Sequence, residues 1–377
     1  MDYSQEEFIK NLRILLDQNK NQDIAELLAQ YQPADIAEVL TELEIPERGM
    51  VFQLLARDFA AMVLEMLDVA VISTLVDTLN NKYLAGIINE MSSDDAADLL
   101  GELPRNARDT LLALMHHDEA DDVQELLEYD AQSAGGIMTT EYVAIRRDIT
   151  AGRAIDVLRE TAADAETVYY VYVVDVKNKL VGVVTLRELI IADPDAPVEE
   201  IMHQGVISVV VDMDQEEVAR VVSKYNFLAV PVVEKDNSLI GIITVDDVID
   251  VIYEEATEDI FLLGGSTELA EHEQSMMLKA LQSRLPWLLV TLAEGLVAGQ
   301  VLRGLEKELS AVVALAFFIP LLTGMGGNVG TQSATIAVRG LAIGQIDTED
   351  VLRVAWRETS TGIILGLING LIVALVA

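Results

Sequence analysis

Carboxylates crowd one short stretch of this 377-residue sequence. Seven of the fourteen residues from Asp246 to Asp259 are aspartate or glutamate. Carboxylate oxygens are hard ligands for divalent cations, and Mg²⁺ retains several of its waters, so loosely spaced carboxylates can hold it. Any one of these side chains alone is typical of a solvated helix surface. As a group, they indicate a cation site.

A second stretch combines glycines with neutral oxygen donors. Four glycines lie between Pro320 and Gly330, and Thr323, Asn328 and Thr331 add hydroxyl and amide oxygens. In apolar surroundings this composition predicts an irregular backbone that lines a polar cavity. The oxygens of such a cavity suit a hydrated cation rather than an anion. Close packing of helices through small residues is the alternative.

The acidic charge is confined to the first part of the chain. The whole sequence has a net charge of −38 although 51% of its residues are hydrophobic. Residues 273–377 carry eight acidic and seven basic side chains, so residues 1–272 carry a net charge of −37. This balance excludes a nucleic-acid partner held by phosphate contacts. The lack of cysteine excludes disulfides, thiolate metal sites and cysteine nucleophiles.

Residues 1–131 are expected to form an acidic, all-α domain. Apolar residues recur at spacings of three and four, and helix-start signals stand in the breaks between them. The segments 35–40 and 95–100 look like copies of one unit, which predicts a helical-repeat stack. His116 and His117 lie among four carboxylates, which indicates either a metal site or, as we favour, a solvated helix start.

Residues 132–256 change to the alternating pattern of strands. Strand, turn and strand are predicted at 168–174 and 180–185, and the pattern returns 59 residues later at 230–233 and 239–244. Helices are expected at 151–161, 187–191, 215–225 and 246–252.

The two copies share a closing signature. Gly182 and Thr185 match Gly241 and Thr244, and each threonine is followed three residues later by an acid. This repeated α/β unit resembles a tandem pair of CBS domains, which are regulatory modules that often bind adenosine nucleotides. The resemblance makes ATP a candidate ligand. It implies stacking by Tyr170 and Phe227, a phosphate contact by Arg187 and a ribose contact by Glu188. Alternatively, the aromatic residues belong to the core and Arg187 is a surface charge.

Residues 284–377 are expected to form an α-helical transmembrane domain. Apolar runs at 285–302, 309–322 and 359–377 favour three spans over buried helices of a soluble protein. The N-terminus lacks the features of a signal peptide and is expected in the cytoplasm. Five basic residues then fall inside and two outside, which agrees with the positive-inside rule. We therefore expect a multi-pass protein of the inner cell membrane, with a lipid bilayer around its helices.

The whole domain order resembles the MgtE family of magnesium transporters, and the stretch 314–320 running into Gly-Gly-Asn-Val-Gly-Thr-Gln-Ser-Ala-Thr is specific to it. The resemblance implies a homodimeric Mg²⁺ channel, not an enzyme, whose acidic cytosolic domains bind Mg²⁺ and close the pore. Residues 257–283 would be connecting helices, and Gly326, Gly327 and Asn328 would line the pore. The implied metal ligands are Asp94, Asp95, Asp98, Asp247, Asp250, Glu254, Glu255, Glu258 and Asp259.

Two features depart from the family pattern. Asn226 replaces an acidic residue, which puts one sensing site in doubt. The family has five membrane helices whereas this sequence shows three, so we expect a truncated chain. A membrane-anchored CBS sensor of adenine nucleotides or metal, without conduction, is the alternative function. No grouping of nucleophile, acid and base indicates catalysis.

Overall fold

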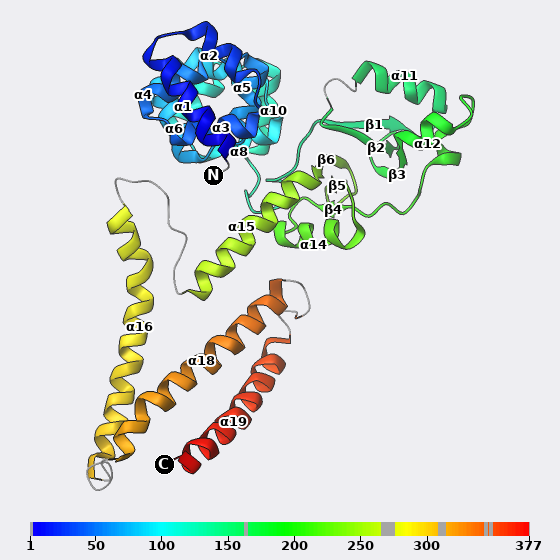
Figure 1. Cartoon of the computed structure of the whole chain (residues 1–377). Helices are drawn as coiled ribbons and strands as arrows, with labels where there is room; N and C mark the ends of the chain where they lie inside the picture. The colour runs from blue at the N-terminus through cyan, green and yellow to red at the C-terminus, as the bar shows by residue number, and fades with distance from the viewer. Residues whose placement is uncertain are drawn as a thin grey trace. The chain divides into compact units, whose positions relative to one another are not determined.

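The computed structural model describes residues 3–161, 165–264, 276–307, 314–342, 346 and 350–376. The chain divides into two compact units, residues 1–249 and 250–377. The first unit holds a helical domain and two small sheets, and the second consists of long helices (Figure 1). This layout confirms the predicted fold class for the first unit, while the membrane domain is described only in part.

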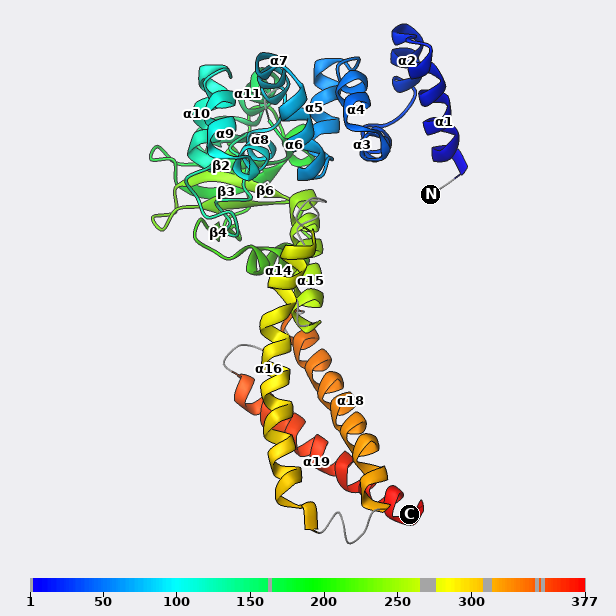
Figure 2. The same ribbon diagram turned by 90° about the vertical axis from the view of Figure 1, so that its left-hand side faces the viewer.

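The N-terminal domain is a stack of short helices (Figure 2). Helices α2 to α10 begin exactly twelve residues apart, and helices two apart in sequence pack together, as in α3 with α5 and α5 with α7. The stack confirms the helical repeat that two of its segments predicted. The helices are α1 (Tyr3–Asp17), α2 (Asn21–Leu28), α3 (Pro33–Glu42), α4 (Ile45–Phe52), α5 (Arg57–Glu65), α6 (Val69–Thr78), α7 (Asn81–Ile88), α8 (Ser93–Glu102), α9 (Arg105–Leu112) and α10 (His117–Leu126).

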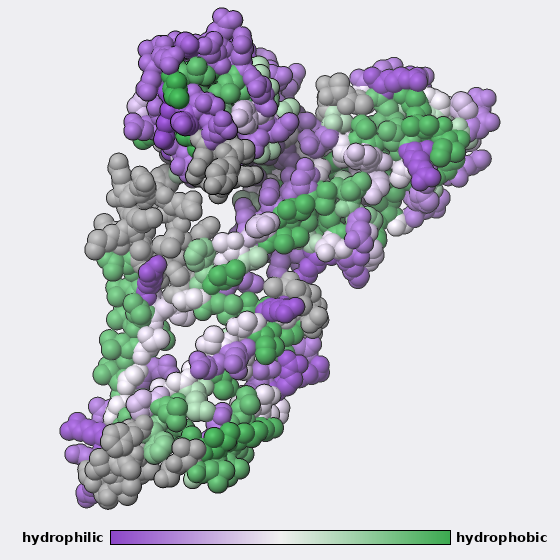
Figure 3. Space-filling model, in the orientation of Figure 1, coloured by the Kyte–Doolittle hydropathy of each residue, from purple (hydrophilic) through white to green (hydrophobic). Residues whose placement is uncertain are grey.

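One buried apolar position recurs along the helical stack. Four residues that are separated by twelve positions, or by a multiple of twelve, are fully buried: Leu40, Phe52, Leu64 and Leu100. Hydrophilic side chains cover the outside of the domain, whereas hydrophobic ones gather along the long C-terminal helices (Figure 3). Short helices of this kind depend on tertiary packing for stability, because eight to ten residues seldom stay helical alone in water.

Two sheets of the same topology follow the helical domain. In the first sheet β1 pairs in parallel with β2, which pairs in antiparallel fashion with β3, and β4, β5 and β6 repeat this order. The elements are β1 (Tyr142–Arg146), α11 (Ala151–Thr161), β2 (Thr167–Val174), β3 (Leu180–Thr185), α12 (Leu186–Ile191), α13 (Val198–Ile201), β4 (Val209–Val210), α14 (Gln215–Tyr225), β5 (Ala229–Val233), β6 (Leu239–Thr244) and α15 (Val245–Leu263). The predicted strands and helices are confirmed, although α15 is longer than expected.

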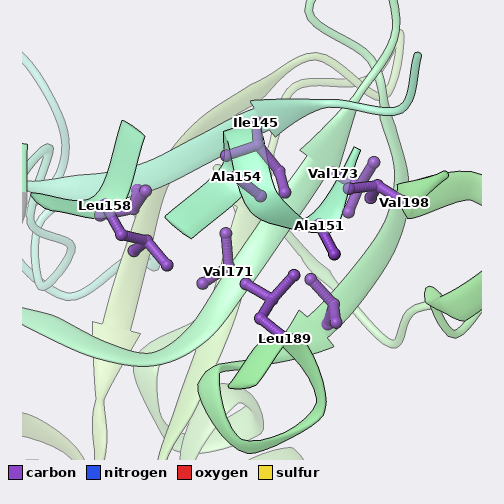
Figure 4. Close-up of a cluster of buried hydrophobic side chains, with 10 residues drawn as sticks. Ile145, Ala151, Ala154, Leu158, Val171, Val173, Leu189 and Val198 are labelled. Atoms are coloured by element: carbon purple, nitrogen blue, oxygen red, sulfur yellow. The ribbon is translucent and has the colours of Figure 1, made fainter. Parts of the chain in front are cut away.

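The side chains of β2 alternate between two apolar cores. Val171 and Val173 lie in a cluster with residues of β1, α11 and α12, among them Ile145 and Leu158 (Figure 4). Tyr172, on the opposite face, packs instead against residues of the second repeat. Because side chains of a strand alternate between faces, one strand joins its own repeat to the neighbouring one.

The second unit contains three long helices, α16 (Met276–Gly304), α18 (Ala314–Ala342) and α19 (Val351–Val376). By length and composition, two segments of the described helices can cross a membrane, Arg284–Gly304 and Val351–Leu375. Residues 265–275 of the expected connecting segment and 309–313 of the second apolar run lie outside the described residues.

The prediction of a broken second span is wrong. Helix α18 runs without interruption through Pro320 and all four glycines of the glycine-rich stretch. Glycine adopts helical dihedral angles without steric hindrance, and an unbroken helix satisfies backbone groups that apolar surroundings cannot. The Thr323 hydroxyl donates to the carbonyl oxygen of Ile319 at 2.9 Å, so it serves the helix rather than a cavity.

Candidate functional site

Asp94 is a buried carboxylate in the first turn of α8. Asp94 is only 7% exposed, and its Oδ1 atom has no hydrogen-bond partner within the described part of the chain. Burial raises the pKa of Asp94, and the charge of Asp95 adds to that increase. The preceding residue, Ser93, donates its N–H to Glu141 Oε1 at 3.1 Å. This bond attaches α8 to the segment that enters the first CBS repeat.

Asp247 faces the same region from the start of α15. Thr244 donates both its N–H, at 3.2 Å, and its hydroxyl to Asp247 Oδ2. Burial and the charge of Asp94 nevertheless raise the pKa of Asp247 to about 8. The structure therefore brings near one another two of the implied metal ligands, which are 153 residues apart in the sequence.

Three glutamates that no sequence pattern indicated lie near these two aspartates. Burial is the largest cause that raises the pKa of Glu65, Glu141 and Glu166 to about 7, and charges of Asp94 or Asp95 contribute to each. Glu65 ends α5, while the other two precede β1 and β2. No periodicity marks any of them, because segments far apart in the sequence bring them near Asp94. Asp94 is buried and Glu141 and Asp247 are half-buried, whereas Glu65 and Glu166 keep exposed surface although surrounding atoms desolvate their carboxyl groups. We use the name acidic pocket for this group of five carboxylates, Glu65, Asp94, Glu141, Glu166 and Asp247.

A divalent cation fits the chemistry of the acidic pocket. Buried carboxylates that repel one another are stabilised by a cation between them, and the unpartnered Oδ1 of Asp94 offers a free acceptor. Within the described residues, no three carboxylate or imidazole groups converge into a ready-made metal cage. Mg²⁺ tolerates this arrangement because retained waters fill its octahedral shell. Asp94 and Asp247 are the residues best placed to hold such an ion.

The other implied ligands are placed differently. Asp95 accepts a hydrogen bond from the Ser92 hydroxyl at 2.6 Å, and Asp98 is exposed on α8. The remaining carboxylates follow Asp247 along α15 but belong to the second unit: Asp250, Glu254, Glu255, Glu258 and Asp259. Their expected role in metal binding is still a prediction.

The candidate nucleotide residues line two adjoining cavities of the CBS pair. Tyr170, Arg187 and Glu188 border a wide cavity of about 870 Å³. Tyr170 and Phe227 border a smaller one of about 180 Å³, together with Tyr172 and His203. Both cavities have apolar walls with a few polar groups, which is typical of small-molecule sites. The structure thus gathers all four residues around neighbouring spaces.

Asn226 and His117 have local structural roles. Asn226 ends α14 in the left-handed conformation, with φ 54° and ψ 45°, which asparagine adopts more readily than most residues. His117 lies 2.9 Å from Asp121 through its Nδ1 atom, and both side chains are exposed. The latter pair agrees with the solvated helix start that the sequence favoured.

The expected pore residues lie within α18. Gly326, Gly327 and Asn328 follow one another along this helix, and a Cβ atom at either glycine would meet no neighbour within 4 Å among the described residues. In this single chain the glycines are therefore not required by packing inside the second unit. The alternative that small residues pack helices closely has no support at these two positions.

Three family models match the chain in succession. The MgtE intracellular N domain matches residues 31–132, CBS domains match 134–195 and 198–254, and the MgtE divalent cation transporter domain matches 319–377. Combined with the fold, these matches define a chain with the domain order of CBS-containing divalent cation transporters.

Relatives narrow this class to one family. The magnesium transporters MgtE of Thermus thermophilus and Bacillus subtilis are 47% and 41% identical over 65% and 68% of this chain. The chain spans about half of these relatives, 55% and 56% of their lengths. The soluble part of a magnesium transporter is 37% identical with a TM-score of 0.61, covering 67% of this chain and 99% of that structure. This chain belongs to the MgtE family.

One solved relative carries a nucleotide. The cytosolic domain of the Mg²⁺ channel MgtE in complex with ATP is 39% identical, with a TM-score of 0.62. The similarity covers 64% of this chain and 99% of that structure.

Proposed function

We propose that this protein is a Mg²⁺ channel of the inner membrane, gated by Mg²⁺ binding to its acidic cytosolic domains. The observation that carries the proposal is the facing of Asp94 and Asp247, which come from the helical domain and the second CBS repeat. Burial is the largest cause of the raised pKa of both groups, and the charge of Asp94 adds to the increase at Asp247. A cation that removes this repulsion favours the docked arrangement of the two domains.

Ion concentration then controls domain docking by mass action. A ligand that binds the docked arrangement and not the separated one stabilises docking by an amount that grows with the logarithm of its concentration. The net charge of −37 on residues 1–272 opposes docking when no cation is bound. Docking at high Mg²⁺ closes the pore, and loss of the ion opens it.

The conduction path is assigned to α18. Asn328 presents its amide oxygen to the permeating ion, and Gly326 and Gly327 allow the ion to approach the helix closely because they lack side chains. The domain matching residues 319–377 in the family of divalent cation transporters supports this assignment. The acidic domains face the cytoplasm, and two copies of the chain form the channel in a lipid bilayer.

The CBS pair of this chain is also proposed to bind ATP. The ATP complex of the homologous cytosolic domain supports this second activity, as do the two cavities around Tyr170 and Phe227. In this arrangement the aromatic rings hold the base, Glu188 accepts from the ribose and Arg187 pairs with phosphate.

Flux through liposomes that carry the protein tests the main proposal. Mg²⁺ entry should occur at low Mg²⁺ on the cytosolic side, and it should fall as that concentration rises. Asp94→Asn combined with Asp247→Asn should leave entry high at both concentrations, because the amides hold Mg²⁺ only weakly and the remaining negative charge of residues 1–272 still opposes docking. Nucleotide or metal binding without any flux would favour a membrane-anchored sensor and contradict the proposal.

A further inference from the structure

His203 forms a short contact with the proposed ribose acceptor. Its Nε2 atom lies 2.6 Å from Glu188 Oε1. The other carboxylate oxygen, Oε2, accepts the Thr185 N–H at 2.9 Å and the Thr185 hydroxyl at 2.8 Å. Glu188 is thus held from both ends, by the residue that caps α12 and by an imidazole from a later segment.

The backbone places His203 where it can make this contact. His203 and Val183 exchange backbone hydrogen bonds of 2.8 and 3.0 Å, which fix the segment beside β3. A Cβ atom on the adjacent Gly182 would lie 2.5 Å from Met202 Sδ and 3.2 Å from the His203 carbonyl oxygen. The glycine of the Gly-x-x-Thr signature therefore permits the close approach of the His203 segment.

The second repeat has the same framework without the imidazole. Thr139 exchanges backbone hydrogen bonds with Ile242, the counterpart of Val183, and therefore occupies the place of His203. Asp247, the counterpart of Glu188, lies near Asp94 instead. One repeat thus provides its signature carboxylate with a nitrogen donor, whereas the signature carboxylate of the other repeat lies near a carboxylate of the helical domain.

The charge state of Glu188 determines which atom carries the proton. Burial raises the pKa of Glu188, but hydrogen bonds from Thr185 and His203 outweigh that effect, and the net pKa lies below the usual value. An ionised carboxylate only accepts, so the Nε2 atom of His203 carries the hydrogen. A carboxylate offers about four acceptor positions. Thr185 fills two and His203 a third, which leaves a single position open on Oε1.

We propose that His203 positions Glu188 in the nucleotide site, so that the carboxylate accepts from only one of the two ribose hydroxyls of bound ATP. The role rests on the proposed binding of ATP to the CBS pair. His203 lines the small cavity and Glu188 the wide one, so the pair stands where the two cavities adjoin. A fixed carboxylate distinguishes the two hydroxyls, whereas a rotating one serves either.

The test compares ATP, 2′-deoxy-ATP and 3′-deoxy-ATP by calorimetry on the full chain in detergent. In the unmodified protein one deoxy analogue should bind about tenfold more weakly than the other, as expected for one hydrogen bond to a charged acceptor. His203→Ala should reduce that ratio to about threefold or less, since the carboxylate can then rotate. His203→Gln retains an N–H donor and should restore the ratio. The matched control is His117→Ala, which removes an exposed imidazole–carboxylate pair elsewhere and should change nothing.

The outcomes separate this proposal from the one on which it rests. If the unmodified protein binds no ATP, both the nucleotide site and the role of His203 are wrong. If ATP binds but the two deoxy analogues bind equally well, or His203→Ala leaves their ratio intact, only the role of His203 is wrong. Equal weakening of all three nucleotides by His203→Ala would show a merely structural side chain and would also overturn it.

Discussion

Glu188 and Asp247 occupy equivalent positions in the two CBS repeats, and each accepts the N–H and the hydroxyl of the threonine three residues before it. Their surroundings oppose each other. Hydrogen bonds from Thr185 and His203 outweigh burial and lower the pKa of Glu188, whereas burial and the charge of Asp94 raise that of Asp247 to about 8. Duplication of one signature has thus yielded a nucleotide contact in one repeat and a cation contact in the other, according to our proposals.

Neutralising the acidic pocket should remove the response to Mg²⁺. In limited proteolysis of the full chain, millimolar Mg²⁺ should slow cleavage of the unmodified protein at constant ionic strength, which excludes simple screening. Asp94→Asn with Asp247→Asn should abolish this protection, because the amides hold Mg²⁺ only weakly. The control is Asp58→Asn with Asp77→Asn, two exposed aspartates of the same helical domain, which should respond normally. Equal protection of both double variants would refute the assignment.

Stability without Mg²⁺ should fall as the pH rises from 6 to 8. Raised pKa values mean that the folded chain binds more protons than the unfolded chain between about pH 4 and 8. Each carboxyl therefore contributes most to stability while protonated, and the contribution is lost as the pH passes through the folded pKa of about 7 to 8. Thermal unfolding in a chelator at pH 6, 7 and 8 measures this loss.

Protons should compete with Mg²⁺ for the carboxylates of the acidic pocket. Protons and Mg²⁺ share the carboxylates of the acidic pocket, so the midpoint for Mg²⁺ protection should be lower at pH 8 than at pH 6. Asp247→Asn should flatten the dependence of stability on pH at its upper end. A melting temperature that rises from pH 6 to pH 8 without Mg²⁺ would contradict the burial of these groups.

Asn328→Leu should abolish Mg²⁺ flux while insertion and assembly continue. Leucine removes an amide oxygen but suits an apolar environment, so folding should not suffer. Gly327→Val should have a larger effect, because a β-branched side chain at this position also restricts the ion path. Uptake of Mg²⁺ by liposomes, with the amount of inserted protein measured in parallel, provides the comparison. Gln300→Leu on α16 serves as the control for loss of a polar side chain in an apolar helix, and its flux should stay normal. Normal flux through Asn328→Leu would show that the pore lies elsewhere.

Gly241→Ala should loosen the segment that leads to the acidic pocket. A Cβ atom there would lie 2.7 Å from Met138 Sδ and 2.8 Å from the Thr139 carbonyl oxygen, which is backbone and cannot rotate away. We expect a loss of about 1–3 kcal/mol in the free energy of unfolding, the usual range for overpacking. Gly101→Ala is the matched control, since its nearest neighbour is a Leu127 methyl at 3.6 Å. Denaturant titration of both variants measures their free energies of unfolding. Equal stability of the two variants would contradict the prediction, because it would show that the Met138–Thr139 segment moves to accommodate the added methyl group.

The sequence alone determined the elements and their order, because local patterns carry that information. The alternation of apolar residues and the repeated Gly-x-x-Thr spacing predicted every strand from β2 to β6 except the two-residue β4, together with α11 and α14. Spacings of three and four predicted the helical stack. These periods reflect the geometry of strands and helices, which requires no knowledge of distant residues.

Only the tertiary structure decided which carboxylates become buried. Asp94 and Asp98 are four residues apart on one helix, yet Asp94 is 7% exposed and Asp98 faces solvent. Glu65, Glu141 and Glu166 join the acidic pocket because separate segments meet there, and no local pattern records such a meeting. The unbroken helix through Pro320 has a related cause, since helical hydrogen bonding in apolar surroundings outweighs the weak helical preference of glycine. Burial and long-range repulsion depend on the whole fold, and so the chemistry of these groups emerged only with it.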